Sequence, residues 1–452
     1  MKKMHMIVNL KQNGDPAENT RILQKSLDLG GSFRIDQPGT YDFQGFLTIG
    51  DNTALECSAG VFLRRVGEVT GPMPPFVLNK GVCEGTINQN IRIEGLHLVT
   101  NGVDMVKGML FPGLRGHVGF IGVKNLVIRD FECHDLEKMG YGIQIVNFEN
   151  ILLENLFIEG LKDGVHLGRG SKFTIRHAKF RTFDDPIALN AFDYCLSNAQ
   201  YGWLEDGIIE DCYDLNDIDT TGFFCRLLGG SWCNWYDGME VQNSTLAVHN
   251  GRLYSASMPV VKRDIPLRSH IPPTHENGFA EVDGIKWRMV QKHDGKYDAG
   301  CRRITFRDIF LQKTRKVAFA FELSANPWAV SVPDSLPIPV QEDFVFDGIY
   351  SGSGVGAMLE LDAPCKNIHI SNSTIDGDAL LCQVLSGRET DYYPTDITFT
   401  GTAFKRSAAL LKGKSNEHVR IILNACIMPA EGELTCEGNA RIEANQLQIK
   451  KI

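Results

Sequence analysis

Three aspartates lie in a stretch that is otherwise mainly apolar or basic, LKDGVHLGRGSKFTIRHAKFRTFDDPIALN, residues 161–190. Asp163 precedes Asp184 by 21 residues, and Asp185 follows directly. Carboxyl groups that share a site raise one another's pKa, and a raised pKa is what a general acid needs near neutral pH. If the fold brings these three residues together, their types therefore indicate general acid and base chemistry.

A repeated phrase describes the elements that must position these acids. It consists of a polar residue, an apolar one, any residue, a second apolar one, and then a polar residue or glycine. It occurs as NIRIEG, NLVIRD, NILLEN, KFTIRH, RITFRD, DFVFDG, NIHISN, DITFTG, HVRIIL and NARIEA, beginning at residues 90, 125, 150, 172, 303, 343, 367, 396, 418 and 439. The alternation is that of a β-strand. Short strands at a spacing of about 22–25 residues, with no helices between them, are typical of a parallel β-helix.

We therefore predict an all-β fold, a single-stranded right-handed parallel β-helix of roughly ten coils. A leucine-rich repeat has a similar period, but the sequence shows neither its Leu-x-x-Leu-x-Leu phrase nor an asparagine ladder. A β-sandwich would show turns about every 8–12 residues. The one good amphipathic helix, residues 16–31, is expected to cap the N-terminal end of the core.

The period breaks between about 213 and 299, where three of the five tryptophans lie: Trp232, Trp235 and Trp287. LAVHNGRLYSA predicts a hairpin that turns at Asn250 and Gly251. We expect a small β-rich module at 225–292 that divides the β-helix into residues 1–224 and 293–452. The phrase WCNWYDG…NGRLY…W resembles small carbohydrate-binding modules. The tryptophans either form the core of the module or stack on sugar rings at the rim of a cleft.

Coil stacking explains the spacing of the three acids. One coil is about 22 residues, so Asp163 lies on one coil and the Asp184–Asp185 pair on the next. Coils stack at the strand spacing of about 4.7–4.9 Å, which brings all three to one face. Adjacent side chains of a regular strand point to opposite faces, so the chain must bend there, and Pro186 suits a bend.

On these residues the sequence resembles the polygalacturonase-like glycoside hydrolases. YGIQIVNFENILLENLFIEGLKDGVHL is similar to the coil that leads to the family's Asn-Thr-Asp-Gly motif, FDDPIAL is similar to its Gly-Asp-Asp-Cys-Ile-Ala motif, and residues 19–65 are similar to its N-terminal region. The resemblance implies an inverting hydrolase. In it Asp184 is the general acid, Asp163 and Asp185 hold and deprotonate the attacking water, and acid and base stand roughly 6.5–9.5 Å apart.

The sequence also departs from this family. Leu161 and Lys162 stand where the family has Asn-Thr, Phe183 stands where it has glycine, and its Gly-His-Gly motif is not visible. Arg288 is a loose candidate for the Arg-x-Lys motif that pairs with a substrate carboxylate, but Val290 replaces the lysine. We expect an α-linked galacturonic acid- or galactose-type glycan as substrate. FDDPI followed by a β-rich insertion also resembles the β-helical α-1,3-galactosidases, which act on a neutral sugar.

Further substrate contacts are expected from residues that coil stacking places beside the acids: His166, Lys138, Tyr141 and Gln144, together with Arg288. A strand histidine such as His166 can equally be structural. Cys133 and His134 have no partners at metal-ligand spacing. We therefore expect no metal and no cofactor.

Two other classes of function stay open. In a Ca²⁺-dependent polysaccharide lyase of the same architecture, the acids would hold the ion and an Arg or Lys would abstract a proton. In a non-catalytic β-helix that binds glycan or serves as a structural part, the acids would do no chemistry. Each of these would act on or bind an oligo- or polysaccharide.

Composition excludes several classes of protein. The chain has 452 residues, 43% of them hydrophobic and 22% charged, with a net charge of −9. The charge argues against a general nucleic-acid binder, and no apolar run reaches the about 18 residues that a membrane span needs. No signal peptide is visible at the N-terminus, so we expect a cytoplasmic protein, or a secreted or periplasmic one if a signal was removed. The twelve cysteines never form a Cys-x-x-Cys pair and are expected to be buried thiols. The oligomeric state is left open.

Overall fold

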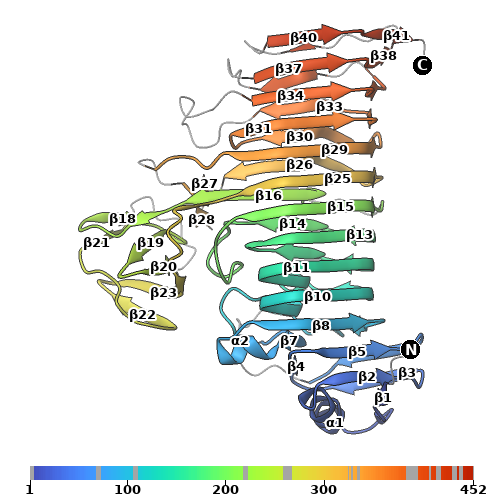
Figure 1. The fold of residues 1–452 in the computed structure, drawn as a ribbon, viewed down its shortest axis with the longest axis vertical. Helices are drawn as coiled ribbons and strands as arrows, with labels where there is room; N and C mark the ends of the chain where they lie inside the picture. Colours follow the sequence, from blue (N-terminus) through green and yellow to red (C-terminus); the bar gives the residue numbers. More distant parts are fainter. Residues whose placement is uncertain are drawn as a thin grey trace.

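Parallel strands stack coil upon coil along the long axis of the molecule, with the chain ends near opposite ends of the stack (Figure 1). The computed structural model describes residues 5–67, 73–104, 110–216, 222–257, 267–323, 325–326, 329–332, 336–382, 395–406, 409–413, 419–429, 435–436 and 441–450. The fold is the predicted right-handed parallel β-helix.

The longest ladder contains every strand that has the repeat phrase, together with three strands that lack it. It runs through β2 (Gly31–Ile35), β5 (Thr53–Cys57), β8 (Asn88–Glu94), β10 (Gly116–Leu136), β11 (Tyr141–Gly160), β13 (Gly170–Thr182), β15 (Leu204–Asp214), β25 (Cys301–Leu311), β29 (Gln341–Ser351), β31 (Cys365–Ser371), β34 (Thr395–Thr400), β37 (Val419–Asn424) and β40 (Arg441–Asn445). The prediction of roughly ten coils counted only strands with the phrase. Since β2, β5 and β15, which lack it, also belong to the ladder, the β-helix has a few more coils than predicted. In β15 the first apolar position is Gly207, where a Cβ would lie 2.2 Å from the Phe173 ring of the coil below.

A second ladder of short strands forms another face. Its members are β4 (Leu47–Ile49), β7 (Val77–Asn79), the first residues of β10 and β11, β12 (Val165–Leu167), β14 (Ile187–Asn190), β16 (Cys225–Ser231), β26 (Arg315–Leu323), β30 (Val355–Leu361), β33 (Asp378–Cys382), β36 (Ala409–Gly413) and β39 (Thr435–Cys436). At the two ends of the molecule a third face has strands of its own: β3 (Gly39–Phe43), β6 (Val61–Arg65), β9 (His97–Val99), β32 (Thr374–Ile375), β35 (Ala403–Phe404), β38 (Ile427–Pro429) and β41 (Gln448–Lys450).

The polar ends of the repeat phrase turn the chain between faces. Asn125 and Asp130 have φ angles of 54° and 53°, in the left-handed region that Asn and Asp tolerate best among residues with a side chain. Side-chain amides at the first of these corners donate to one another from coil to coil at 2.7–3.0 Å, in the row Asn150, Asn125, Asn90 and Asn52. An asparagine ladder, which the sequence analysis did not find, thus lies on the outside of the β-helix.

Inward-facing residues stack in register through the core. Ile128, Leu153 and Ile175 pair in successive coils and are fully buried, and each such side chain contributes about 1.5–3 kcal/mol by leaving water. The helix α1 (Pro16–Asp28) covers the N-terminal end, as predicted, and buries Leu23 and Leu27.

A module projects from the side of the β-helix (Figure 1). It contains β17 (Cys233–Asn234), β18 (Met239–Val241), β19 (Leu246–His249), β20 (Arg252–Ala256), β21 (Leu267–Ser269), β22 (Phe279–Val282) and β23 (Ile285–Lys292). The predicted hairpin is β19–β20, with Asn250 and Gly251 at positive φ. The module begins later than residue 225, because β16 continues the register of β14 as a strand of the β-helix. Trp287 is buried in its core, and Trp232 is buried against Phe192 of the main core.

The described cysteines are free thiols and most of them are buried, as expected. Among the described residues, no helix has the length and apolar character to cross a membrane.

The corner residue Asn125 offers a test of the coil geometry. Both Asn125→Ala and Asn125→Gly remove the ladder hydrogen bonds, but only alanine must hold a left-handed φ against its Cβ. We expect Asn125→Ala to be less stable than Asn125→Gly by about 0.5–1 kcal/mol, after allowing for the greater freedom of glycine in the unfolded chain. The neighbouring exposed strand residue Lys124 is the control, since there glycine should be the worse substitution. Thermal melting of the four variants measures the order, and equal or reversed order at position 125 would contradict this account of the corners.

Candidate active site

The structure brings the three predicted acids together at one end of the short strands. Asp163 lies two residues before β12 and Asp185 two residues before β14, and the pairing of Val165 with Ile187 stacks them one coil apart. At least one carboxylate oxygen of Asp163, Asp184 and Asp185 lies within 4.8 Å of the others. This distance between nearest oxygens is shorter than the roughly 6.5–9.5 Å expected for an inverting pair. Two oxygens that share one hydrogen-bonded water stand about 5–6 Å apart or less, so the cluster can hold one water between two carboxylates.

Lys162 supplies a cation to this acid cluster. Its ammonium group forms an ion pair with Asp184 and lies 3.5 Å from Oδ1 of Asp163. The side chains of Lys162 and Asp184 are 21% and 27% exposed, whereas that of Asp163 is 6% exposed. Asp184 is therefore the acid with the greatest access from solvent. The sequence analysis noted Lys162 only as a departure from the family motif.

The three carboxyl groups have pKa values displaced in opposite directions. Burial raises the pKa of Asp184, and the charge of Asp163 raises it further against the opposing effect of Lys162. Burial and both neighbouring acids raise the pKa of Asp185 well above its ordinary value. Burial also favours a higher pKa for Asp163, but Lys162, His166 and Arg115 outweigh it and hold that pKa below the ordinary 3.8. The pKa of Asp163 thus lies below its ordinary value, which favours the carboxylate, whereas the pKa values of Asp184 and Asp185 lie above theirs, which favours the protonated forms.

His166 and Tyr141 pack next to the acid cluster, His166 against Asp163 and Tyr141 against His166. Nδ1 of His166 is 3.1 Å from Oδ2 of Asp163, and the imidazole ring stacks on Tyr141 with 4.3 Å between centroids. Both side chains are buried, since His166 is 0% and Tyr141 2% exposed. His166 thus orients Asp163 directly, and Tyr141 does so through the imidazole ring on which it stacks.

Gln144 and Arg288 are occupied by the backbone. The Gln144 amide accepts from the N–H groups of Arg115 and Gly116 and donates to the carbonyls of Gly113 and Ser197. Arg288 donates to the carbonyl oxygens of Cys195, Asn198 and Ala199 at 2.8, 2.7 and 3.4 Å. This geometry leaves Arg288 unsuited to the carboxylate-binding role that the Arg-x-Lys comparison suggests. Lys138 is exposed in the turn between β10 and β11, with no contact to the acids among the described residues.

The polar surface continues from the acids onto the following coils. Arg226 pairs in register with Ala188 and forms a 2.6 Å ion pair with Glu322. Burial, and then the charge of Glu322, raises the pKa of Glu360 on the next coil. Sequence reasoning missed these residues because the inserted module separates them from Asp184 along the chain. The strand register Ala188–Arg226–Ala320–Glu360 is the signal that could have found Arg226 and Glu360, and Glu322 lies two residues after Ala320 on the same strand.

A second group with metal-binding side chains lies on a different face. His97 and His134 each place Nε2 3.0 Å from Oε2 of Glu132, so His134 does have partners of ligand type. The sequence reading missed them because His97 comes from the preceding coil, where it pairs with Glu132. Cys133 is buried and is not part of this group.

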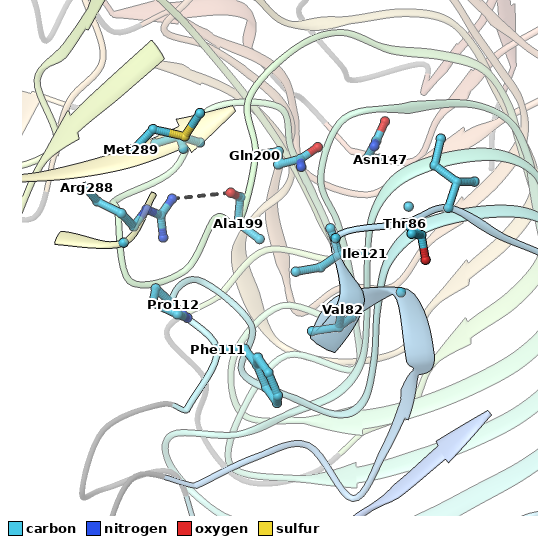
Figure 2. Close-up of a pocket in the computed structure, with 16 residues that line it drawn as sticks. Val82, Thr86, Phe111, Pro112, Ile121, Asn147, Ala199, Gln200, Arg288 and Met289 are labelled. Carbon is cyan, nitrogen blue, oxygen red and sulfur yellow. Dashed lines mark hydrogen bonds between the residues drawn. The ribbon is translucent and has the colours of Figure 1, made fainter. Parts of the chain in front are cut away.

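A pocket of about 310 Å³ lies between the short helix α2 (Lys80–Glu84), the turn at Ala199 and Gln200, and β23 (Figure 2). Its walls include Phe111 and Met289, and the Arg288 guanidinium that donates to the Ala199 carbonyl. None of the three acids lines this pocket. It is therefore separate from the acid cluster.

Comparison with known proteins gives structural likenesses only. No family model matches the chain, and no curated protein does. The N-terminal fragment of bacteriophage Phi29 gene product 12 is similar at a TM-score of 0.49 and 11% identity, over 96% of this chain and 68% of that one. The Streptococcus pneumoniae surface protein and adhesin PfbA has a TM-score of 0.46 at 10% identity, over 99% and 100%. A Yersinia enterocolitica family 28 exopolygalacturonase has a TM-score of 0.43 at 15% identity, over 95% and 79%. Likenesses this distant carry no argument about function.

Lys162→Met should expose the imbalance of charge in the cluster. Removing one partner of a partly buried ion pair leaves uncompensated carboxylates, at a cost of about 1–3 kcal/mol near pH 7.5. A carboxyl group whose pKa is higher in the folded than in the unfolded chain gains stability as pH falls toward its ordinary pKa. The deficit in melting temperature against the unsubstituted protein should therefore shrink between about pH 7.5 and pH 5. Lys172→Met, which removes an exposed lysine paired with Glu149, is the control. A deficit that grows on acidification would contradict the charge assignment.

Proposed function

We propose that the acid cluster is the active site of a glycan-cleaving enzyme, a glycoside hydrolase that works by general acid and base catalysis. The observation that carries the proposal is the clustering of three carboxyl groups whose pKa values are displaced in opposite directions. Paired carboxyl groups with separated pKa values are the arrangement that acid–base hydrolysis requires.

Asp184 is the proposed general acid. It has a raised pKa, and it is the acid whose side chain solvent reaches most. In the reaction Asp184 would give its proton to the oxygen of the glycosidic bond as the bond from that oxygen to the anomeric carbon breaks. The adjacent Lys162 ammonium would stabilise the carboxylate that remains.

Asp163 is the proposed base. Its low pKa keeps it ionised, so it can accept a proton from a water molecule that attacks the anomeric carbon. Asp185 would hold the same water, since one of its carboxylate oxygens lies within 4.8 Å of one on Asp163, while its Oδ1 accepts a 2.7 Å hydrogen bond from the Phe223 N–H. Attack by water from the side opposite the leaving group inverts the anomeric centre, which proton NMR of the first product formed would show directly.

The charge of the surroundings favours a neutral sugar. The cations nearest the acids already have partners: Lys162 contacts Asp184, Arg226 pairs with Glu322, and Arg115 donates to a carbonyl and to hydroxyl groups. Arg288 is occupied by carbonyl groups. Among the described residues, each cation near the acids already has a partner, so a uronate carboxylate would have to displace one, and an α-linked galactose-type glycan fits better than a galacturonic acid-type one. Turnover of aryl α-galactosides and of neutral galactans, compared with aryl α-galacturonides and pectic oligomers, tests this choice.

The substitutions Asp163→Asn, Asp184→Asn and Asp185→Asn should each lower kcat on the substrate so found by about 10²-fold or more, the usual worth of a positioned acid or base. Asparagine keeps the shape of the side chain but has no carboxylate charge and no transferable acid proton. Melting temperature should hold or rise in Asp184→Asn, because like-charge repulsion falls, and should hold in Asp185→Asn, because a carboxyl group that keeps its proton has no charge to lose.

Asp206→Asn, which changes an exposed aspartate paired with Arg303, is the matched control and should keep full turnover. Normal turnover by Asp184→Asn would end its assignment as the acid. Activity that a chelator abolishes, with an unsaturated product, would instead support the lyase. Glycan binding without turnover by the unsubstituted protein would support a binding β-helix.

A further inference from the structure

The segment between β14 and β15 folds back over the coils that precede the acids. Residues 193–199 of this segment, here called the plug, lie on the outer side of β10 and β11. The Tyr194 hydroxyl accepts from the Arg115 guanidinium, and the Ser197 hydroxyl lies 2.7 Å from that of Tyr141. The Ser197 carbonyl accepts from the Gln144 amide at 2.8 Å. In Figure 1 the green loop that follows β14 descends beside β13 and β11.

The plug covers this part of the face completely. Gln144, His166 and Ser197 are 0% exposed, and Tyr141 and Arg115 are 2% and 3% exposed. Contacts run without a gap from the plug through Tyr141 and His166 to Asp163. No sugar ring can therefore lie on the coils of β10 and β11 beside the acids.

The plug is held from its outer side as well. Arg288 of the module donates to three of its carbonyl groups, at Cys195, Asn198 and Ala199, and the Ser244 hydroxyl accepts from the Cys195 N–H at 2.9 Å. Asn198 donates back to the carbonyl of Asn190 in β14. These bonds on two sides fix the plug in place, and they give the inserted module a structural role at the active site.

The opposite side of the acids is more open. The side chains of Lys162 and Asp184 are 21% and 27% exposed, and those of Arg226 and Glu322 on the following coils are 24% and 16% exposed. In the described part of the chain, polar side chains that solvent reaches thus continue from the acids across β16 and β26. The acids therefore lie at one end of this row of solvent-accessible polar residues, next to the plug.

We propose that the enzyme acts on chain ends, because the plug blocks the path that the remainder of a glycan chain would need on one side of the cleaved bond. This inference rests on the proposed hydrolase function. The terminal unit of the chain would lie against the plug, and the rest of the chain would extend over β16 and β26 past Arg226 and Glu322.

Product sizes during digestion by the full-length protein test the proposal. With a long neutral galactan, or whichever glycan the screen identifies, we expect one small product of fixed size from the first time point while the polymer shortens slowly. A ladder of intermediate lengths early in the reaction would overturn end-directed action while leaving the hydrolase assignment intact. Absence of cleavage of every glycan tested would overturn both.

Loosening the plug gives a second readout. Arg288→Gln removes the guanidinium that fixes the plug, and we expect it to lose the single product size, with internal cleavage products appearing. Arg307→Gln, which changes an exposed arginine paired with Glu210 on a distant surface, should keep the original product pattern. An Arg288→Gln protein that is folded by circular dichroism but still releases only the one product would overturn the role of the plug, whereas mixed sizes would support it.

Discussion

The contact of the Lys162 ammonium group with both Asp184 and Asp163 is the interaction on which the rest of the site depends. Three carboxyl groups meet within 4.8 Å, and Lys162 is the cation in direct contact with two of them. Burial makes every unpaired charge expensive, so one ammonium cannot keep all three carboxylates ionised. The protein resolves this imbalance by dividing the group into an ionised Asp163 and acids of raised pKa. That division is the physical basis of the proposed acid and base roles.

The β-helix fold brings three carboxyl groups together with one ammonium group and so creates the imbalance of charge. Left-handed corner residues such as Asn125 fix where each coil turns, so residues one coil apart stand at the strand spacing. Lys162 and Asp163 on one coil consequently face Asp184 and Asp185 on the next. The plug and the module then close the adjoining face, which keeps His166 and Tyr141 buried and the acids partly desolvated. Stacking creates the charge cluster, and the inserted residues limit its access to solvent.

Much of this arrangement could be predicted from the sequence, because it depends on spacing. The repeat phrase predicted the β-helix, and the 21-residue interval predicted that Asp163 and Asp184 meet. Contacts that depend on chain segments far apart could not be predicted. The plug reaches back from Ser197 to Gln144, and Arg288 reaches it across the module. Gln144 and Arg288 were expected to contact substrate, but backbone groups occupy both side chains. A local sequence pattern does not show which loop will cover a face of the β-helix.

The proton occupancy of the acid cluster tests the central claim most directly. Infrared difference spectroscopy between the unsubstituted protein and Asp185→Asn near neutral pH would detect a protonated carboxyl group that the substitution removes. The account predicts such a band, and predicts that Asp163→Asn does not remove it, because Asp163 is already ionised. A spectrum in which all three carboxyl groups are ionised near neutral pH would contradict the division of roles on which the proposed chemistry is built.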